Sequence, residues 1–150
     1  MTTALERRYR DTLRIAGVGM IVFGIWAVVR NYITVVVYEE EIRQYFFGLD
    51  PFLMVMVPAT LELAMRLFVG FGARAESKGA KGGKAYLVVA ALIALIHLLG
   101  IVVYILSVIM QYAWLDEAIM LVVIDATCLY LVLDLIVSAV KLRRLEREDG

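Results

Sequence analysis

Long apolar stretches alternate with short polar segments along this chain of 150 residues. Four stretches stand out, roughly over residues 13–37, 52–71, 85–110 and 118–140. Each has about the 20 residues that a helix needs to cross ~30 Å of hydrocarbon at ~1.5 Å per residue. The pattern therefore predicts an all-α integral membrane protein, a four-helix bundle that forms one domain over residues 1–150.

The polar segments between the stretches have local signals of their own. Residues 72–84 are rich in Gly and Lys, which predicts a flexible basic loop. Residues 33–49 begin with a β-branched run, and two interpretations stay open: the segment extends the first helix, or it forms an outer cap. Asp50 followed by Pro51 is typical of a helix start, because Asp caps free N–H groups and Pro suits the first helical position. Pro58 predicts a kink inside the second helix.

The charge of the polar segments alternates along the chain. The basic segments precede the first stretch, join the second to the third and follow the fourth; they hold Arg7, Arg8, Arg10, Arg14, Arg74, Lys78, Lys81, Lys84, Lys141, Arg143, Arg144 and Arg147. The two remaining connections hold Glu39, Glu40, Glu41, Asp50, Asp116 and Glu117. Because basic segments stay in the cytoplasm, both termini and residues 72–84 are predicted to be cytoplasmic, with the aromatic and acidic first loop outside. The predicted location is the plasma membrane, which in a bacterium is the inner membrane.

Composition narrows the classes of function. Apolar residues make up 63% of the chain and its net charge is zero, so a lipid bilayer is the expected partner and nucleic acid is not. The single Cys128 and the single His97 exclude an internal disulfide and a histidine-rich metal site. The sequence contains no recognisable nucleophile–base pair, metal cluster or phosphate loop. It therefore predicts no cofactor and no metal, and it favours a protein that is not an enzyme.

Small and polar residues recur on one face of the first helix. Gly17, Gly24 and Asn31 are spaced seven residues apart, and Gly100 lies on a similar stripe of the third helix. Small side chains let membrane helices approach closely. We therefore expect these residues at helix–helix contacts, within one chain, in a homo-oligomer or in a larger membrane complex.

Ionisable residues inside the apolar stretches are the main candidates for function: Arg30, Glu62, Arg66, His97, Asp125 and Asp134. A charge in hydrocarbon costs roughly 2.5–3.5 kcal/mol on insertion scales, so such groups normally have partners. Depths counted at ~1.5 Å per residue place them in three layers. Arg30 would face Asp125 in the outer layer. Glu62 would face His97 near the midplane. Arg66 would face Asp134 in the inner layer, and it can also pair with Glu62 along its own helix.

Two hypotheses of different class follow from these residues. In the first, the transport or ligand site of a small oligomeric transporter or channel, coupled to protons or cations, consists of Glu62, His97, Arg66 and Asp134. In the second, the chain is a non-catalytic membrane subunit or assembly protein, whose intramembrane charges pair with one another or with a partner. Arg30 and Asp125 are candidates for structural pairing under either hypothesis.

Overall fold

The computed structural model describes residues 4–44, 48–80, 83–110 and 115–148. Its elements are helices throughout, in the order α1 (Ala4–Val37), α2 (Glu39–Arg43), α3 (Pro51–Ser77), α4 (Ala85–Ile109) and α5 (Leu115–Glu148). Within these described residues, α1, α3, α4 and most of α5 are long and apolar enough to span a membrane. The predicted all-α four-helix membrane bundle is confirmed, and the chain is a multi-pass membrane protein.

The helices extend beyond the apolar stretches at their charged ends. α1 begins at Ala4 and α5 continues to Glu148, because Arg, Glu and Leu residues sustain a helix outside hydrocarbon. The prediction of a loop over residues 72–84 was wrong for residues 72–77, which belong to α3. α3 instead ends where Gly79 adopts a φ of 89° and donates its N–H to the carbonyl of Glu76 at 2.9 Å.

The connection between α1 and α3 combines both interpretations of residues 33–49. Residues 33–37 extend α1, and the short helix α2 follows beyond Tyr38. Asp50 caps α3 as predicted, since its Oδ1 accepts the N–H of Phe52 at 2.9 Å. α3 remains helical through Pro58. Lys81 and the side chains of Glu41, Asp116 and Glu117 lie outside the described residues.

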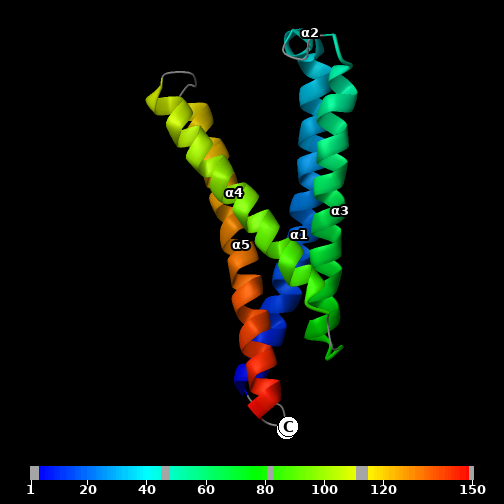
Figure 1. The fold of residues 1–150 in the computed structure, drawn as a ribbon, viewed down its shortest axis with the longest axis vertical. Helices are drawn as coiled ribbons and strands as arrows, with labels where there is room; N and C mark the ends of the chain where they lie inside the picture. Colours follow the sequence, from blue (N-terminus) through cyan, green and yellow to red (C-terminus); the bar gives the residue numbers. More distant parts are fainter. Residues whose placement is uncertain (1–3, 45–47, 81–82, 111–114, 149–150) are drawn as a thin grey trace.

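The long helices form two antiparallel pairs, α1 with α3 and α4 with α5 (Figure 1). The pairs meet at the end that holds the beginning of α1, the end of α5 and the connection between α3 and α4. They diverge toward the opposite end, so that the ribbon is V-shaped. We call the closed end the inner end and the divergent end the outer end, after the predicted topology. The beginning of α1 and the end of α5 thus lie at the same end, as an even number of spans requires.

Glycines bring the backbones of α1 and α3 into contact. A Cβ atom on Gly17 would lie 2.8 Å from the carbonyl oxygen of Gly70, and one on Gly70 would lie 2.7 Å from the carbonyl oxygen of Gly17. Two turns further along α1, a Cβ atom on Gly24 would lie 3.2 Å from the side chain of Arg66. Asn31 is half-buried on the same helix. The close approach of α1 therefore encloses the stem of Arg66.

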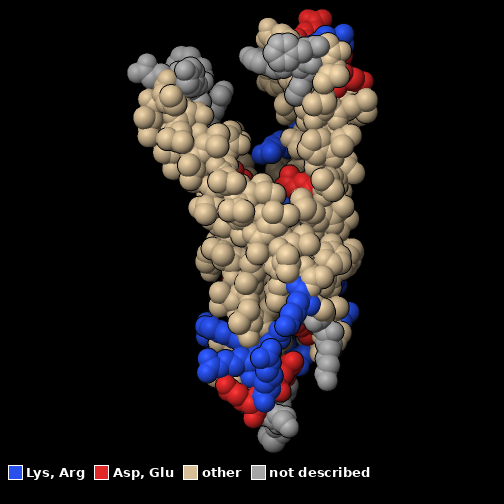
Figure 2. All heavy atoms as spheres, in the orientation of Figure 1, with Lys and Arg blue, Asp and Glu red and all other residues tan. Residues whose placement is uncertain are grey.

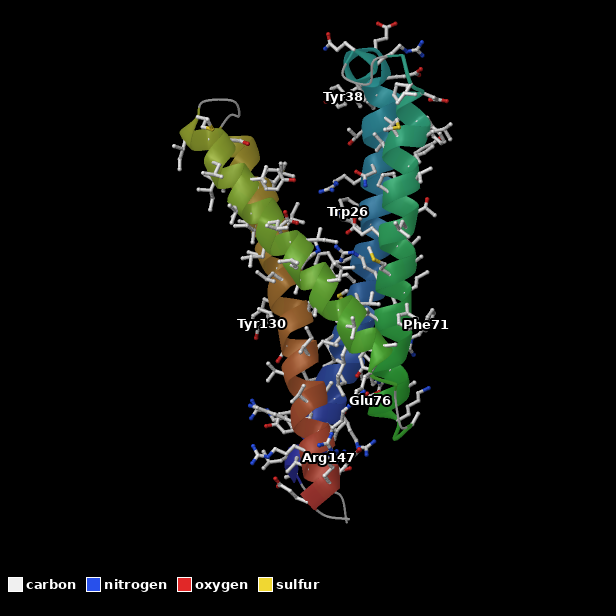
Figure 3. All side chains as sticks on the ribbon, in the orientation of Figure 1. Trp26, Tyr38, Phe71, Glu76, Tyr130 and Arg147 are labelled. Carbon is white, nitrogen blue, oxygen red and sulfur yellow. The ribbon has the colours of Figure 1, made fainter. Side chains whose placement is uncertain are left out.

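The apolar core occupies the inner half of the bundle, where all four long helices meet. It contains the buried side chains of Leu13, Ala16, Met20, Val69, Ala73, Tyr86, Ala90, Ile93, Ala94, Val132, Leu135, Ala139 and Leu142. Large apolar side chains on the outward faces are exposed, among them Phe71 and Tyr130, which point away from the bundle (Figure 3). These outward faces match a hydrocarbon environment.

We expect Gly17→Ala to lower the free energy of unfolding by about 1–3 kcal/mol, because the added methyl group collides with the backbone oxygen of Gly70. Unfolding of the purified protein in detergent measures the change. Gly83→Ala is the matched control, since nothing lies within 4 Å of its Cβ position, and its effect should stay within about 0.5 kcal/mol. Equal stability of the Gly17→Ala variant and the wild type would contradict the close backbone contact.

Candidate functional site

A polar pocket lies where the two helix pairs begin to diverge. It has a volume of about 210 Å³ and is lined by residues of α1, α3, α4 and α5. Figure 2 shows charged atoms of both signs at the floor of the gap between the two arms. The ionisable side chains that line the pocket are Arg30, Glu62, Arg66, His97, Tyr104, Asp125 and Cys128. Five of the six predicted intramembrane ionisable residues thus surround one space, and Asp134 does not.

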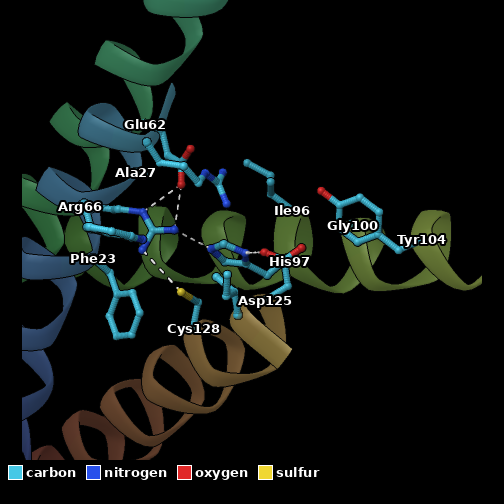
Figure 4. A pocket seen from close by; sticks show the side chains of 13 residues that line it. Phe23, Ala27, Glu62, Arg66, Ile96, His97, Gly100, Tyr104, Asp125 and Cys128 are labelled. Carbon is cyan, nitrogen blue, oxygen red and sulfur yellow. Dashed lines mark hydrogen bonds and ion pairs between the residues drawn. The ribbon is translucent and has the colours of Figure 1, made fainter. Parts of the chain in front are cut away.

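Arg66 is the centre of a hydrogen-bonded network at this floor (Figure 4). Only 2% of this residue is exposed. Its Nε–H donates to Glu62 Oε1 at 2.9 Å, and its Nη2 lies 2.7 Å from the same oxygen. The same Nη2 lies 2.7 Å from His97 Nε2, and Nη1 lies 3.8 Å from Cys128 Sγ. The guanidinium therefore joins α3 to both α4 and α5.

His97 continues the network to Asp125, whose Oδ1 lies 2.7 Å from His97 Nδ1. A guanidinium is always protonated and can only donate, so Nε2 of His97 must accept the bond from Arg66. The proton of the neutral imidazole then lies on Nδ1 and is donated to the Asp125 carboxylate. The arrangement therefore favours one tautomer of the ring.

The network leads from the buried interior to the pocket. The exposed fraction of the side chain rises from 3% for Arg66 to 17% for Asp125 and 33% for Glu62. In the part of the chain that the structure describes, no buried side-chain nitrogen or oxygen lacks a hydrogen-bond partner. A buried cation is therefore compensated by hydrogen-bonded acceptors, while the outer ends of the network remain accessible from the pocket.

Gly100 lies against the carboxylate of Asp125, a contact that the stripe of small residues does not predict. A Cβ atom at Gly100 would lie 2.8 Å from Asp125 Oδ2. The glycine therefore makes room for the carboxylate at the pocket wall. The predicted pair of Arg30 and Asp125 is not formed: both residues line the pocket, but the side chain of Arg30 makes no hydrogen bond or ion pair among the described residues.

The predicted pairing of Arg66 with Asp134 is wrong. Arg66 contacts Cys128, and Asp134 lies six residues further along α5, a distance of about 9 Å toward the inner end. Helical side chains lean toward the N-terminus of their helix, so Arg66 points back toward Glu62 and away from the inner end. Asp134 is half-buried and makes no ion pair within the described ranges. His97 likewise bonds to Arg66 and Asp125 rather than to Glu62.

A second polar cluster, absent from the sequence interpretation, closes the inner end. Glu76 on α3 accepts two bonds from Arg143 on α5, from Nε at 2.7 Å and from Nη2 at 2.6 Å. Its Oε2 also accepts the hydroxyl of Tyr86 on α4 at 2.7 Å. We call Glu76, Tyr86 and Arg143 the inner clamp. The sequence pattern does not indicate Glu76 as a cluster member, because it predicts a loop over residues 72–77. The helix-favouring residues around it in "ARAES" are the signal that indicates the longer helix.

Arg10 adds a contact between the beginning and the end of the chain. Its guanidinium bonds to Glu146 at 3.0 Å and to Glu6 one turn earlier on α1. A further bond of 3.4 Å reaches the carbonyl of Ser77 at the end of α3. The inner end is thus held by hydrogen bonds among all four long helices, in addition to the packing of the apolar core.

Comparisons with known proteins do not assign the chain to a family. No protein-family model, no curated protein and no solved structure matches the chain. Among the described residues, no group of three or more His, Cys, Asp or Glu side chains is arranged to hold a metal ion. The features that indicate a function are therefore the geometry of the pocket and of the two polar clusters.

We expect Glu76→Leu to destabilise the protein by about 1.5–3 kcal/mol, because Arg143 and the Tyr86 hydroxyl both lose the carboxylate that accepts their hydrogen bonds. Combining Glu76→Leu with Arg143→Leu should recover part of the loss, which a double-mutant cycle in detergent measures. Glu148→Leu is the control: its ion pair with Arg144 is exposed and should contribute about 1 kcal/mol or less. Additive effects of the two clamp substitutions would show that the pair contributes no coupling.

We expect nitrogen NMR of the single histidine to show a neutral ring with its proton on Nδ1. The preference should disappear in the Arg66→Met/Asp125→Leu double variant, because both hydrogen-bond partners of the ring are then absent. Glu62→Gln is the control, since Glu62 touches neither ring nitrogen, and it should leave the tautomer unchanged. A wild-type ring protonated on Nε2 would contradict the bond from Arg66.

Proposed function

We propose that this protein is a small proton-coupled transporter of the plasma membrane that works as a homo-oligomer. The observation that supports this most is the combination of an open polar pocket with a buried chain of titratable groups at its floor. A polar pocket of about 210 Å³ is large enough for several water molecules, which could deliver protons to the network. Ionisable groups at mid-membrane depth are characteristic of proton and solute pathways.

Protons would act on the network at Glu62, its most exposed member. Protonation of Glu62 removes the negative charge that holds Arg66 along α3, and Arg66 is left with His97 and Cys128. Asp125 is joined to Arg66 only through the neutral imidazole, so it compensates the guanidinium less directly. Proton uptake at Glu62 therefore leaves Arg66 without a directly bonded anion. Binding of another acceptor to Arg66 inside the pocket then becomes more favourable.

A proton that reaches His97 would weaken one contact between the two helix pairs. With both nitrogens protonated, the imidazole can no longer accept the bond from Arg66, and the two cations repel. The bond between Arg66 and His97 is one of the links between α3 and α4, while the bond from His97 to Asp125 lies within the α4–α5 pair. Protonation of His97 thus weakens contact between the pairs and leaves contacts within each pair intact.

Transport also requires the inner end to open, and there the structure is closed. The apolar core and the inner clamp lie between the pocket and the inner end. In the proposed cycle the pocket loads while the core and the clamp are closed. The two helix pairs then rock against each other, so that the pocket closes at the outer end as the clamp opens.

Proton movement in proteoliposomes tests this proposal. Vesicles loaded with a pH-sensitive dye receive a pH gradient, with valinomycin and potassium setting the membrane potential. We expect protein-dependent proton movement in the wild type and a rate at the protein-free level in Glu62→Gln, because the amide keeps the shape of the side chain and loses its titratable charge.

Glu39→Gln is the matched control for this experiment. Glu39 is also the acidic member of an ion pair with an arginine four residues later, Arg43, but both side chains are more than half exposed. Its substitution should leave the rate unchanged. Full activity in Glu62→Gln, or no proton movement by the wild type under any imposed gradient, would overturn the transport proposal.

One observation favours the second hypothesis, a membrane subunit. An apolar groove of about 300 Å³ runs between the outer halves of α4 and α5, where the two arms have diverged. Its walls include Tyr104, Val108 and Val122, and a transmembrane helix of a partner would cover them. A wild type that moves no protons and co-purifies with a stoichiometric membrane partner would favour this function. A stable homo-oligomer that moves protons would favour the transporter.

A further inference from the structure

A second large groove lies at the inner end of the bundle, on the surface between α4 and α5. It has a volume of about 730 Å³, well separated from the polar pocket described above. Its walls combine apolar side chains with cations: Leu87, Val88, Ala91 and Val140, and Lys84, Arg143, Arg144 and Arg147. Figure 2 shows a dense group of basic atoms around this end of the molecule. We call this surface the inner groove.

The cations of the inner groove differ in how they are held. Arg143 is engaged by Glu76 in the inner clamp. Arg144 pairs with Glu148, but both side chains are mostly exposed, and such a pair is weak. The side chains of Lys84 and Arg147 make no hydrogen bond or ion pair with any residue that the structure describes, and they also line an adjoining pocket of about 430 Å³. An anion could therefore bind between Lys84 and Arg147 without breaking an existing interaction.

The apolar wall extends from these cations toward the middle of the membrane. Lys84 immediately precedes α4, and Leu87, Val88 and Ala91 follow on its first two turns. On the other side, Val140 is two turns above Arg147 on α5. The groove therefore presents positive charge at the level of the membrane surface and apolar walls at the level of the acyl chains.

We propose that the inner groove binds an anionic phospholipid, with its phosphate on Lys84 and Arg147 and an acyl chain along Leu87, Val88 and Ala91. Charge complementarity supports an anionic head group, because the groove rim is basic. The apolar walls support an attached acyl chain, which a free phosphate lacks. The predicted topology places this end in the cytoplasmic leaflet, where anionic lipids attract basic residues. This inference does not depend on the proposed transport function.

Binding can be measured with the full chain in an uncharged detergent. Native mass spectrometry counts bound lipid, and thermal-shift titration gives the affinity for phosphatidylglycerol, phosphatidylcholine and glycerol phosphate. We expect phosphatidylglycerol to bind and stabilise the protein more strongly than phosphatidylcholine with the same acyl chains. Glycerol phosphate should have no effect at the same concentration. Equal binding of the two lipids, or binding of glycerol phosphate as strong as that of the lipid, would overturn the proposal.

Charge variants separate a built site from diffuse attraction to the basic end. Lys84→Gln combined with Arg147→Gln should weaken phosphatidylglycerol binding about 30-fold, the effect expected for two lost cations near the membrane surface. Arg7→Gln combined with Arg8→Gln removes the same charge from exposed residues of α1 outside the groove. This control should leave the affinity unchanged. Equal weakening in both double variants would show non-specific attraction and overturn the site.

A steric variant tests the acyl-chain part of the groove. Ala91→Trp places a large side chain in the groove at an exposed position, so no buried packing is lost. It should abolish the bound lipid seen by native mass spectrometry. Ala64→Trp, at an exposed position on α3 outside the inner groove, is the control and should retain it. Undiminished binding to Ala91→Trp would overturn the assignment of the groove.

Discussion

A guanidinium cannot stay in hydrocarbon without acceptors, and the centre of this structure depends on how Arg66 satisfies that requirement. Its partners come from three helices: Glu62 on its own helix, His97 on α4 and Cys128 on α5. The hydrogen bonds of one buried cation therefore orient α4 and α5 relative to α3. Arg66 also determines the tautomer of His97, which in turn orients Asp125.

The α1–α3 contact, the apolar core, the inner clamp and the pocket lie around Arg66 and its partners. At the α1–α3 contact, Gly24 lets α1 approach the stem of Arg66 closely, as Gly17 and Gly70 let the two backbones approach further along. Toward the inner end, the apolar core and the inner clamp exclude solvent. Toward the outer end, the divergence of the two pairs leaves a pocket. The same network thus faces the packed core on one side and the pocket on the other, an asymmetry on which the proposed transport function depends.

The sequence was sufficient for the fold because crossing hydrocarbon needs a fixed length of apolar helix, and this length is visible in the chain. The spacing of Glu62 and Arg66 also predicted their pair, since residues four apart share a helix face. Depth along the membrane, however, is only one coordinate. It did not give the direction in which Arg66 leans. Depth alone therefore predicted Asp134 as the partner of Arg66 on another helix, whereas the structure has His97. Glu76 was missed for a different reason: apolar content underestimates the length of a helix that continues beyond the hydrocarbon into water.

The distribution of charges between the two helix pairs has a consequence for the biogenesis of the protein. The first pair contains both Arg66 and Glu62, and the second contains both His97 and Asp125. Each hairpin therefore enters the bilayer with a hydrogen-bonded partner for its central ionisable side chain, Glu62 for Arg66 in the first and His97 for Asp125 in the second. The hairpins could insert one after the other during synthesis and join later through Arg66. Membrane insertion and final assembly would then be separate events, with the second limited by how fast two finished hairpins meet in the plane of the lipid.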